Sequence, residues 1–219
     1  TPNPQALTPD PLMMKKILVV EDEAAIRSML VDLLEGLGYA VVEASDGASG
    51  WEKAQNEEPD LLITDVSMPR MKGIDLLAHV KSTRPDVPVI VITGYASLKL
   101  AVDAMRMGAY SFVQKPFEID EMQRIVEAAL EHTRLLDDNK YLRQQLKARY
   151  NFDNRIGSNK EVQEAYVMAA RAAPSTASVL ILGETGTGKE YLARTIHYAG
   201  PRADGPFIKV SCAALPETL

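Results

Sequence analysis

Short apolar runs alternate with amphipathic stretches over most of the 219-residue chain. Five runs rich in β-branched residues and leucine, such as KILVV from Lys16 and VIVIT from Val89, predict buried strands. The stretches between them repeat apolar residues at helical spacing, and several end at glycine, a common helix terminator. This alternation predicts an α/β fold in which a five-stranded, doubly wound parallel sheet is covered by helices on both faces.

The predicted strands and helices follow one another from residue 15 to residue 149 with only short connections between them. Strands are predicted over 15–23, where the strand ends in acids, and over 40–45 and 109–117. Residues 59–69 are predicted as a strand and loop, and 87–97 as a strand and turn. Helices are predicted over 24–39, 46–58, 73–84 and 98–108, followed by a longer helix from Glu118 to about Arg149. A sheet of this kind binds ligands outside the carboxyl ends of its strands, where the strand order reverses.

Polar residues gather at those strand ends. Glu21 and Asp22 close the first strand, Asp65 the third, Thr93 the fourth and Lys115 the fifth. Any one of them alone is compatible with a solvated strand end or a helix cap. All five at successive strand ends instead predict a shared site.

Three carboxylates at one site repel one another unless a cation lies among them. An oxygen-only ligand set with room for water suits Mg²⁺. Such an ion makes a carboxylate tolerable as a nucleophile and neutralises charge on an incoming phosphoryl group. Asp65 precedes the loop VSMPRMKG, which exposes its side chain, so it is the predicted nucleophile. Lys115 and Thr93 are expected to contact phosphoryl oxygens.

The same residues lie in motifs that resemble a known family. The chain is similar in four motifs to the receiver domains of bacterial two-component response regulators: ILVVEDE, LLITDVSMPRMKG, VIVITGYAS and SFVQKPF. The resemblance covers residues 15–130 and implies the flavodoxin-like receiver fold. It also implies that Asp65 accepts a phosphoryl group from a sensor histidine kinase. Mg²⁺ is then held by Glu21, Asp22, Asp65 and the backbone carbonyl of Ser67.

The resemblance further assigns a switch to Thr93, Phe112 and Lys115. A phosphoryl group draws in Thr93 and opens space for the aromatic ring at 112, so packing changes on the face formed by the fourth helix and fifth strand. Family members often have Tyr at this position, whereas Phe112 has no hydroxyl for a hydrogen-bonded form of the switch. The alternative interpretation of Phe112 is an ordinary core residue.

The helix from Glu118 is longer than a compact sheet needs. Its apolar residues follow a seam of threes and fours, which is typical of a two-stranded coiled coil. The seam consists of Ile125, Ala128, Leu135, Leu142 and Leu146, with His132 and Asn139 at polar positions. We therefore predict a helical linker over 131–154 that forms a homodimer together with a receiver face. The alternative is a single helix that lies on the sheet.

A second pattern begins after residue 154. A helix over 161–173 precedes an apolar strand at 178–183, a glycine-rich loop and the helix YLARTIHYA. Strand, loop and helix in this order are the context of a phosphate-binding loop, whose amides and lysine contact nucleotide phosphates. The predicted nucleotide-binding residues are Gly183, Glu184, Thr185, Gly186, Thr187, Gly188, Lys189 and Glu190. Glu190 replaces the usual Ser or Thr, so the hydroxyl ligand of Mg²⁺ is missing.

This region resembles the start of the AAA+ domain of sigma-54-dependent, nitrogen-regulator-like transcription activators, in which Glu commonly follows the lysine. The similar segments are IGSNKEVQE, VLILGETGTGKEYLARTIHYAG and PFIKVSCAALPETL, from 155 to 219. The resemblance implies ATP as a ligand, and a longer parent ATPase with sigma-54 RNA polymerase and DNA as partners. The acidic strand, sensor residues and arginine fingers of that domain are absent from this sequence. We expect the incomplete P-loop fragment to bind nucleotide weakly, without hydrolysis, and to be less stable than the receiver.

Charge and composition restrict the remaining function classes. The formal net charge of −6 argues against a surface that holds nucleic acid by phosphate neutralisation. The single cysteine, Cys212, excludes an internal disulfide, and no apolar run is long enough for a membrane span. The proline-rich opening TPNPQALTPDPL predicts a disordered leader over 1–14. We expect a cytoplasmic protein without membrane contact.

Three hypotheses follow from these patterns. The first is a response regulator in which phosphorylation of Asp65 controls dimerisation and a sigma-54-dependent AAA+ domain, the present chain being a regulatory phosphoacceptor rather than an enzyme. The second is a nucleotide-binding ATPase module. The third is a phosphorylation-independent dimerisation module, against which the intact set of Asp65, Thr93 and Lys115 speaks.

Overall fold

The computed structural model describes residues 15–94, 98–153 and 159–211. The predicted leader over 1–14, the predicted boundary at 154/155 and Cys212 lie outside the described residues. The strands are β1 Lys16–Val20, β2 Ala40–Ala44, β3 Leu61–Asp65, β4 Val89–Thr93 and β5 Ser111–Gln114. The helices are α1 Ala24–Gly36, α2 Gly47–Asn56, α3 Gly73–Thr83, α4 Leu98–Arg106, α5 Ile119–Arg149, α6 Lys160–Ala172 and α7 Lys189–Ala199. The alternation predicted for residues 15 to 149 is confirmed, and β1 and β5 end just before Glu21 and Lys115.

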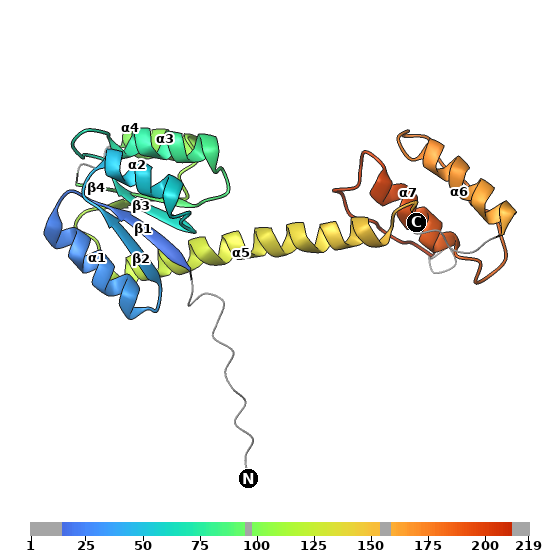
Figure 1. Cartoon of the computed structure of the whole chain (residues 1–219), viewed down its shortest axis with the longest axis horizontal. Coiled ribbons are helices and arrows are strands. Elements are labelled where there is room, and N and C mark those ends of the chain that lie inside the picture. The colour runs from blue at the N-terminus through green and yellow to red at the C-terminus, as the bar shows by residue number, and fades with distance from the viewer. Residues whose placement is uncertain (1–14, 95–97, 154–158, 212–219) are drawn as a thin grey trace, which may run out of the picture. The chain divides into compact units, whose positions relative to one another are not determined.

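All strands of the sheet are parallel and lie in the order β2-β1-β3-β4-β5. Helices α1 and α5 cover one face, and α2, α3 and α4 cover the other, as Figure 1 shows. The strand order reverses at β1, because β2 lies on one side of it and β3 on the other. The predicted doubly wound parallel sheet is thus confirmed.

Burial on both faces explains why the central strands are apolar almost throughout. Every residue of β3 and β4, and all but the first of β1, are buried. Successive side chains alternate between the faces: Ile17, Ile63 and Ile90 pack toward α1 and α5, whereas Leu18 and Val91 pack toward α2, α3 and α4. This two-sided burial makes the strands continuous apolar runs instead of alternating ones.

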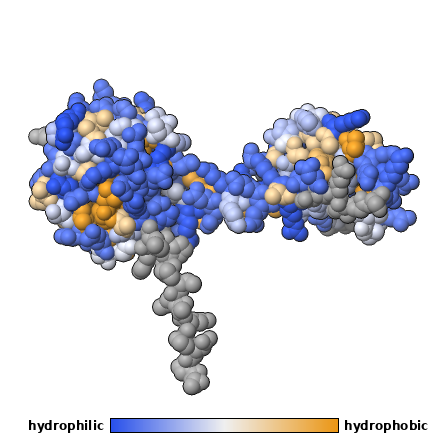
Figure 2. Space-filling view, viewed as in Figure 1, coloured by the Kyte–Doolittle hydropathy of each residue, from blue (hydrophilic) through white to orange (hydrophobic). Residues whose placement is uncertain are grey.

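Helix α5 changes its surroundings along its length. Its first turns pack against the sheet through Met122, Val126 and Leu130, which are almost completely buried. Their spacing of four residues places them on one helix face. Beyond Leu130 the helix is mostly exposed, with Leu135 and Leu142 at 55% and 57%, and in Figure 2 this part is mainly hydrophilic with small apolar patches. The first part of α5 therefore belongs to the sheet's core, while the coiled coil stays a prediction.

The chain divides into two compact units, one up to Leu136 and one from Asp137 onward. In the second unit α6 and α7 form as predicted, but the strand predicted over 178–183 is wrong, because these residues adopt no regular structure. Leu180 and Leu182 are each 82% exposed. A strand requires a hydrogen-bonded neighbour, and the described residues of this unit include no strand that could pair with it.

Helix α2 begins at a buried carboxylate that the sequence analysis did not single out. Asp46 precedes the helix, and its Oδ1 accepts 3.0 Å hydrogen bonds from the backbone amides of Ala48 and Ser49. Its Oδ2 accepts a hydrogen bond from Ser49 Oγ and pairs with Arg70 in the loop after β3. Burial alone would raise the pKa of Asp46, but these hydrogen bonds and the Arg70 charge outweigh it and lower the pKa. Asp46 thus joins the start of α2 to the loop after β3.

We predict that Asp46→Ala lowers the free energy of unfolding by about 1–2 kcal/mol, the usual cost of losing a helix N-cap. Asp46→Asn keeps a side-chain oxygen for the cap and should cost less. The lowered pKa means that the charge stabilises the folded chain above the ordinary carboxyl value of 3.8, and that this contribution is lost as the pH falls through the folded value. Urea unfolding at neutral and acidic pH checks this: the difference between wild type and Asp46→Asn should shrink in acid, and a constant difference would contradict it.

Candidate functional site

The carboxyl ends of four neighbouring strands bring the predicted site residues to one edge of the sheet. Glu21 follows β1, Asp65 ends β3, Thr93 ends β4 and Lys115 follows β5. Because β1, β3, β4 and β5 are neighbours in a parallel sheet, these residues converge where the strand order reverses. A 2.8 Å backbone hydrogen bond from Lys115 N to Thr93 O joins the last two.

Three carboxylates lie within reach of a single ion. Oxygen atoms of Glu21, Asp22 and Asp65 all lie within 4.8 Å of one another. Glu21 and Asp65 are only 1% and 5% exposed, whereas Asp22 is exposed to solvent. The Nζ of Lys115 lies 2.7 Å from Glu21 Oε2 and 3.5 Å from Asp65 Oδ1. One ammonium group therefore bridges the two buried carboxylates.

Burial makes the negative charge of these two carboxylates unfavourable. Removal from water raises the pKa of Glu21, and Lys115 opposes this only in part. Burial raises the pKa of Asp65 in the same way, again against the attraction of Lys115. A single positive charge does not compensate two carboxylates taken out of water. A further cation would relieve the remaining negative charge.

The oxygen atoms at this edge fit a magnesium ion. Apart from their ion pairs with Lys115, neither Glu21 Oε2 nor Asp65 Oδ1 has a hydrogen-bond donor in the described part of the chain, although both atoms are buried. Buried oxygens without donors are costly, and a hard cation satisfies them. All three side chains offer carboxylate oxygens, and the exposure of Asp22 leaves room for water, as Mg²⁺ prefers.

The loop after β3 depends on a close backbone approach at Gly73. Gly73 N donates a 3.0 Å hydrogen bond to Val66 O, and Val66 N donates one to Ile92 O of β4. A Cβ atom at position 73 would lie 1.8 Å from the backbone oxygen of Asp65, so only glycine allows this loop closure. The contact holds Asp65 at the edge of the sheet.

Two further residues support the site without belonging to the predicted set. Arg27 of α1 donates a 2.7 Å hydrogen bond from Nη1 to the backbone oxygen of Glu21 and forms a 3.1 Å ion pair with Glu43. Asp46 holds Arg70 in the loop after β3. The run SDGAS does contain an N-cap signal for Asp46, whereas nothing in the local sequence indicates the partners of Arg27.

The predicted switch residues lie on neighbouring strands. Thr93 is 1% exposed at the end of β4. Phe112 of β5 pairs with Val91 in the sheet register, and its half-buried ring packs against the apolar cluster beneath α2, α3 and α4. Ser67 is exposed in the loop after Asp65. The choice between switch and core roles for Phe112 stays a prediction.

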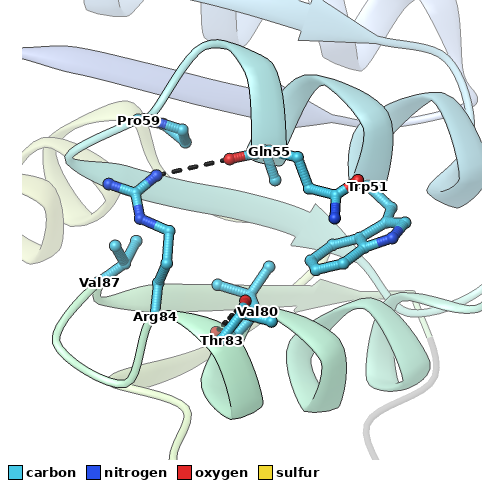
Figure 3. Close-up of a pocket in the computed structure, with 8 residues that line it drawn as sticks. Trp51, Gln55, Pro59, Val80, Thr83, Arg84 and Val87 are labelled. Carbon is cyan, nitrogen blue, oxygen red and sulfur yellow. Dashed lines mark hydrogen bonds between the residues drawn. The ribbon is translucent and has the colours of Figure 1, made fainter.

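A cavity of about 250 Å³ lies between α2 and α3, away from the acidic edge. It is lined by Trp51, Ala54, Gln55, Pro59, Val80, Thr83, Arg84 and Val87. Figure 3 shows Arg84 extending toward α2, where its Nη1 donates a 3.4 Å hydrogen bond to Ala54 O. Pro59 and Val87 precede β3 and β4, so the cavity lies toward the amino ends of the strands. It takes no part in the carboxylate site.

The glycine-rich loop forms the second predicted site. Gly186 and Gly188 have φ angles of 84° and 86°, which favour glycine, and Gly188 immediately precedes α7. Lys189 is folded back on the loop, since its Nζ donates hydrogen bonds of 2.9 Å and 2.6 Å to the backbone oxygens of Gly183 and Glu184. Loop, lysine and helix N-terminus therefore lie together, as a phosphate site requires.

Glu190, which stands where the general phosphate-binding loop has Ser or Thr, forms ion pairs with Arg194 and Lys209. Its Oε1 accepts a 2.9 Å hydrogen bond from Arg194 Nη2, and its Oε2 accepts one of 2.7 Å from Lys209 Nζ. The hydrogen bonds from Lys209 and Arg194 hold the pKa of Glu190 below its usual value. The carboxylate thus connects α7 with the segment around Lys209.

The parallel sheet, with its acidic edge and bridging lysine, defines the first unit as a receiver domain of flavodoxin-like topology. Residues 17–127 match the family described as response regulator receiver domain, and residues 155–219 match the sigma-54 interaction domain. The chain belongs to the response regulators that combine these two domains.

The chain spans about half the length of the curated relatives it matches. It is 39% identical over 206 residues to the regulatory protein AtoC of Escherichia coli K12, a match that covers 94% of this chain and 45% of AtoC. Among solved structures, NtrX from Brucella abortus is 31% identical with a TM-score of 0.59, over 93% of this chain and 45% of NtrX. NtrX has also been solved in complex with ADP. A receiver domain protein from Clostridium thermocellum is 33% identical with a TM-score of 0.54, over 56% of this chain and 98% of that chain.

We predict that Asp65→Asn raises the free energy of unfolding by about 1–3 kcal/mol in buffer without divalent cations, because it removes a charge whose burial outweighs the attraction of Lys115. The ordinary pKa values are 3.8 for Asp65 and 4.5 for Glu21, and both are raised in the folded chain. The folded wild type therefore holds these protons more tightly than the unfolded chain, and it should lose stability as the pH rises from the ordinary pKa values through the raised ones. This loss should be smaller in the variant. Denaturant unfolding across this pH range measures both effects.

Added Mg²⁺ should then stabilise the wild type more than Asp65→Asn, because ion binding to the folded state alone adds to stability. Asp32→Asn, which changes an exposed carboxylate of α1, is the control and should behave like the wild type. Equal stabilisation of the wild type and Asp65→Asn by Mg²⁺ would contradict a metal site that includes Asp65.

Proposed function

We propose that this chain is the phosphorylation-controlled part of a two-component response regulator, in which Asp65 accepts a phosphoryl group from a sensor histidine kinase. The observation that carries the proposal is the cluster of Glu21, Asp22 and Asp65, with carboxylate oxygens within 4.8 Å of one another beside Lys115. Such a cluster is costly for stability, since among the described residues one ammonium group, that of Lys115, pairs with both buried carboxylates. Membership of the receiver family supports the same function.

In the proposed transfer, a carboxylate oxygen of Asp65 attacks the phosphorus atom of a phosphohistidine. The new oxygen–phosphorus bond replaces the phosphorus–nitrogen bond, the imidazole leaves, and Asp65 carries an acyl phosphate. Lys115 Nζ, 3.5 Å from Asp65 Oδ1, then pairs with a phosphoryl oxygen. The hydroxyl of Thr93 contacts another.

The ligands proposed for Mg²⁺ are Glu21, Asp22, Asp65 and the backbone carbonyl of Ser67. Bound there, the ion supplies positive charge that offsets the carboxylates and the incoming phosphoryl oxygens. The chain's own contribution is position: the close approach at Gly73 holds Asp65 at the sheet edge, and burial limits access of water to its carboxylate.

Phosphorylation is proposed to act through Thr93 and Phe112. As Thr93 moves toward the phosphoryl group, the half-buried ring of Phe112 fills the space that opens beside β4. Helix α4 follows β4 and carries Leu98 and Met105 at 84% and 49% exposure. We propose that altered packing of this face and the exposed seam of α5 together control pairing of two copies.

The glycine-rich loop is proposed to bind ATP weakly. Lys189 would exchange the backbone oxygens of Gly183 and Glu184 for nucleotide phosphates. The structure of NtrX in complex with ADP supports nucleotide binding by a chain of this family. Hydrolysis is proposed for a longer parent protein, which would act on sigma-54 RNA polymerase and bind DNA.

The two alternatives are an ATPase module and a phosphorylation-independent dimerisation module. The carboxylates bridged by Lys115 favour the response regulator over both, because neither alternative needs them.

Among the described helices, none is long and apolar enough to cross a membrane. We propose a cytoplasmic location, where a kinase and RNA polymerase are both accessible.

Acetyl phosphate with Mg²⁺ should add one phosphoryl group to the wild type, measured as intact mass. Asp65→Asn should gain none, because an amide cannot form the acyl phosphate. Asp75→Asn, at an exposed carboxylate in the first turn of α3, is the matched control and should be phosphorylated. No addition to the wild type, or equal addition to Asp65→Asn, would exclude Asp65 as the acceptor.

Phosphorylation should also raise the dimer fraction, measured by light scattering. Leu142→Ala, at an exposed seam position, should weaken dimerisation by about tenfold or more, because an apolar contact between helices is lost. Leu136→Ala is the control: this leucine is also exposed, at 45%, but lies off the seam. Equal effects of the two substitutions would argue against pairing through the predicted seam.

A further inference from the structure

An aromatic cluster lies in the second unit where α5 ends. Tyr150 directly follows the helix, and its ring stacks on that of Tyr198 of α7, with ring centres 5.5 Å apart and planes inclined by 17°. The ring centre of Tyr191 lies 5.2 Å from that of Tyr150. The hydroxyl of Tyr191 donates a 2.7 Å hydrogen bond to the backbone oxygen of Arg149. The end of α5 is thus docked on α7.

Arg194 connects this cluster with the phosphate-binding loop. Its guanidinium carbon lies 5.7 Å from the ring centre of Tyr150 and 4.6 Å from that of Phe207, within the range of cation–π attraction. The same guanidinium donates a 2.9 Å hydrogen bond to Glu190. Glu190 follows Lys189 in the sequence, so contacts run continuously from Tyr150 to the nucleotide-binding residues.

Helix α7 is held by the end of α5 together with α6 and the segment 205–209, which contacts α7 through His197 and Glu190. Within α7 only Thr195 is fully buried, and most of its other side chains are half-buried. The segment before the loop forms no strand that could hold the loop from its other side. The N-terminus of α7 carries the amides that face phosphates, and such groups bind well only when their positions are held closely.

We propose that Tyr150 is a positioning residue of the nucleotide site, which holds α7 and thereby the loop that ends at Lys189. The inference rests on the proposed nucleotide binding and adds that the end of the linker helix sets the affinity of this site. Because Tyr150 directly follows α5, displacement of the end of that helix changes nucleotide affinity through the aromatic contact.

The test compares binding of a fluorescently labelled ADP with Mg²⁺ to the whole chain and its variants. Tyr150→Ala should weaken binding by about tenfold, because it removes a stacked ring and a cation–π partner. Tyr150→Phe retains the ring and should restore the affinity. Tyr141→Ala removes a tyrosine that is 60% exposed on α5 and should leave the affinity unchanged.

Amide hydrogen exchange of α7 in the absence of nucleotide provides a second readout. Exchange at the start of α7 should be faster in Tyr150→Ala than in Tyr150→Phe, while exchange in the receiver unit should be unchanged. Wild-type affinity together with unchanged exchange in Tyr150→Ala would overturn the inference but leave the nucleotide site intact. If the wild type binds no more ADP than Lys189→Ala, the proposed nucleotide site itself fails, and the positioning role fails with it.

Discussion

The receiver unit is organised around two buried carboxylates that share one ammonium group. Glu21 and Asp65 lose hydration at the carboxyl edge of the sheet, and Lys115 alone does not compensate their charge. Burial of apolar side chains on both faces of the sheet offsets this unfavourable free energy. The same packing holds the strands in parallel and brings their carboxyl ends together. Because the charge remains partly uncompensated, the same edge attracts a cation and, through it, an anionic phosphoryl group. An arrangement that is unfavourable for stability is therefore the basis of the proposed chemistry.

Helix α5 relates the two units through its covalent continuity. Its first turns belong to the core beneath the sheet, its middle is exposed, and its end is followed by Tyr150 in the aromatic cluster of the second unit. The proposed pairing of copies and the proposed support of the nucleotide loop therefore depend on different parts of one helix. In the second unit, by contrast, exposed apolar residues such as Leu180 and Leu182 indicate weaker packing.

Much of the receiver unit could be predicted because its determinants are local. Apolar runs bounded by glycine and polar residues specified the strands and helices, and strand direction alone placed Asp65, Thr93 and Lys115 at the same edge. The predicted strand at 178–183 was wrong for the opposite reason. An apolar run is compatible with a strand, but only a hydrogen-bonded neighbour makes it one, and local sequence carries no information about that neighbour.

The sequence by itself determined the alternation of strands and helices and the carboxylates at the strand ends, because these depend on periodicity and on the direction of each strand. Its motifs indicated the family by resemblance. Only the tertiary structure decided the distances that give them their chemistry, including the bridge of Lys115 between Glu21 and Asp65. It also decided that Gly73 must lack a side chain and that Tyr150 meets α7, more than forty residues later in the chain. Such contacts join residues that are distant in the sequence, and packing rather than local pattern determines them.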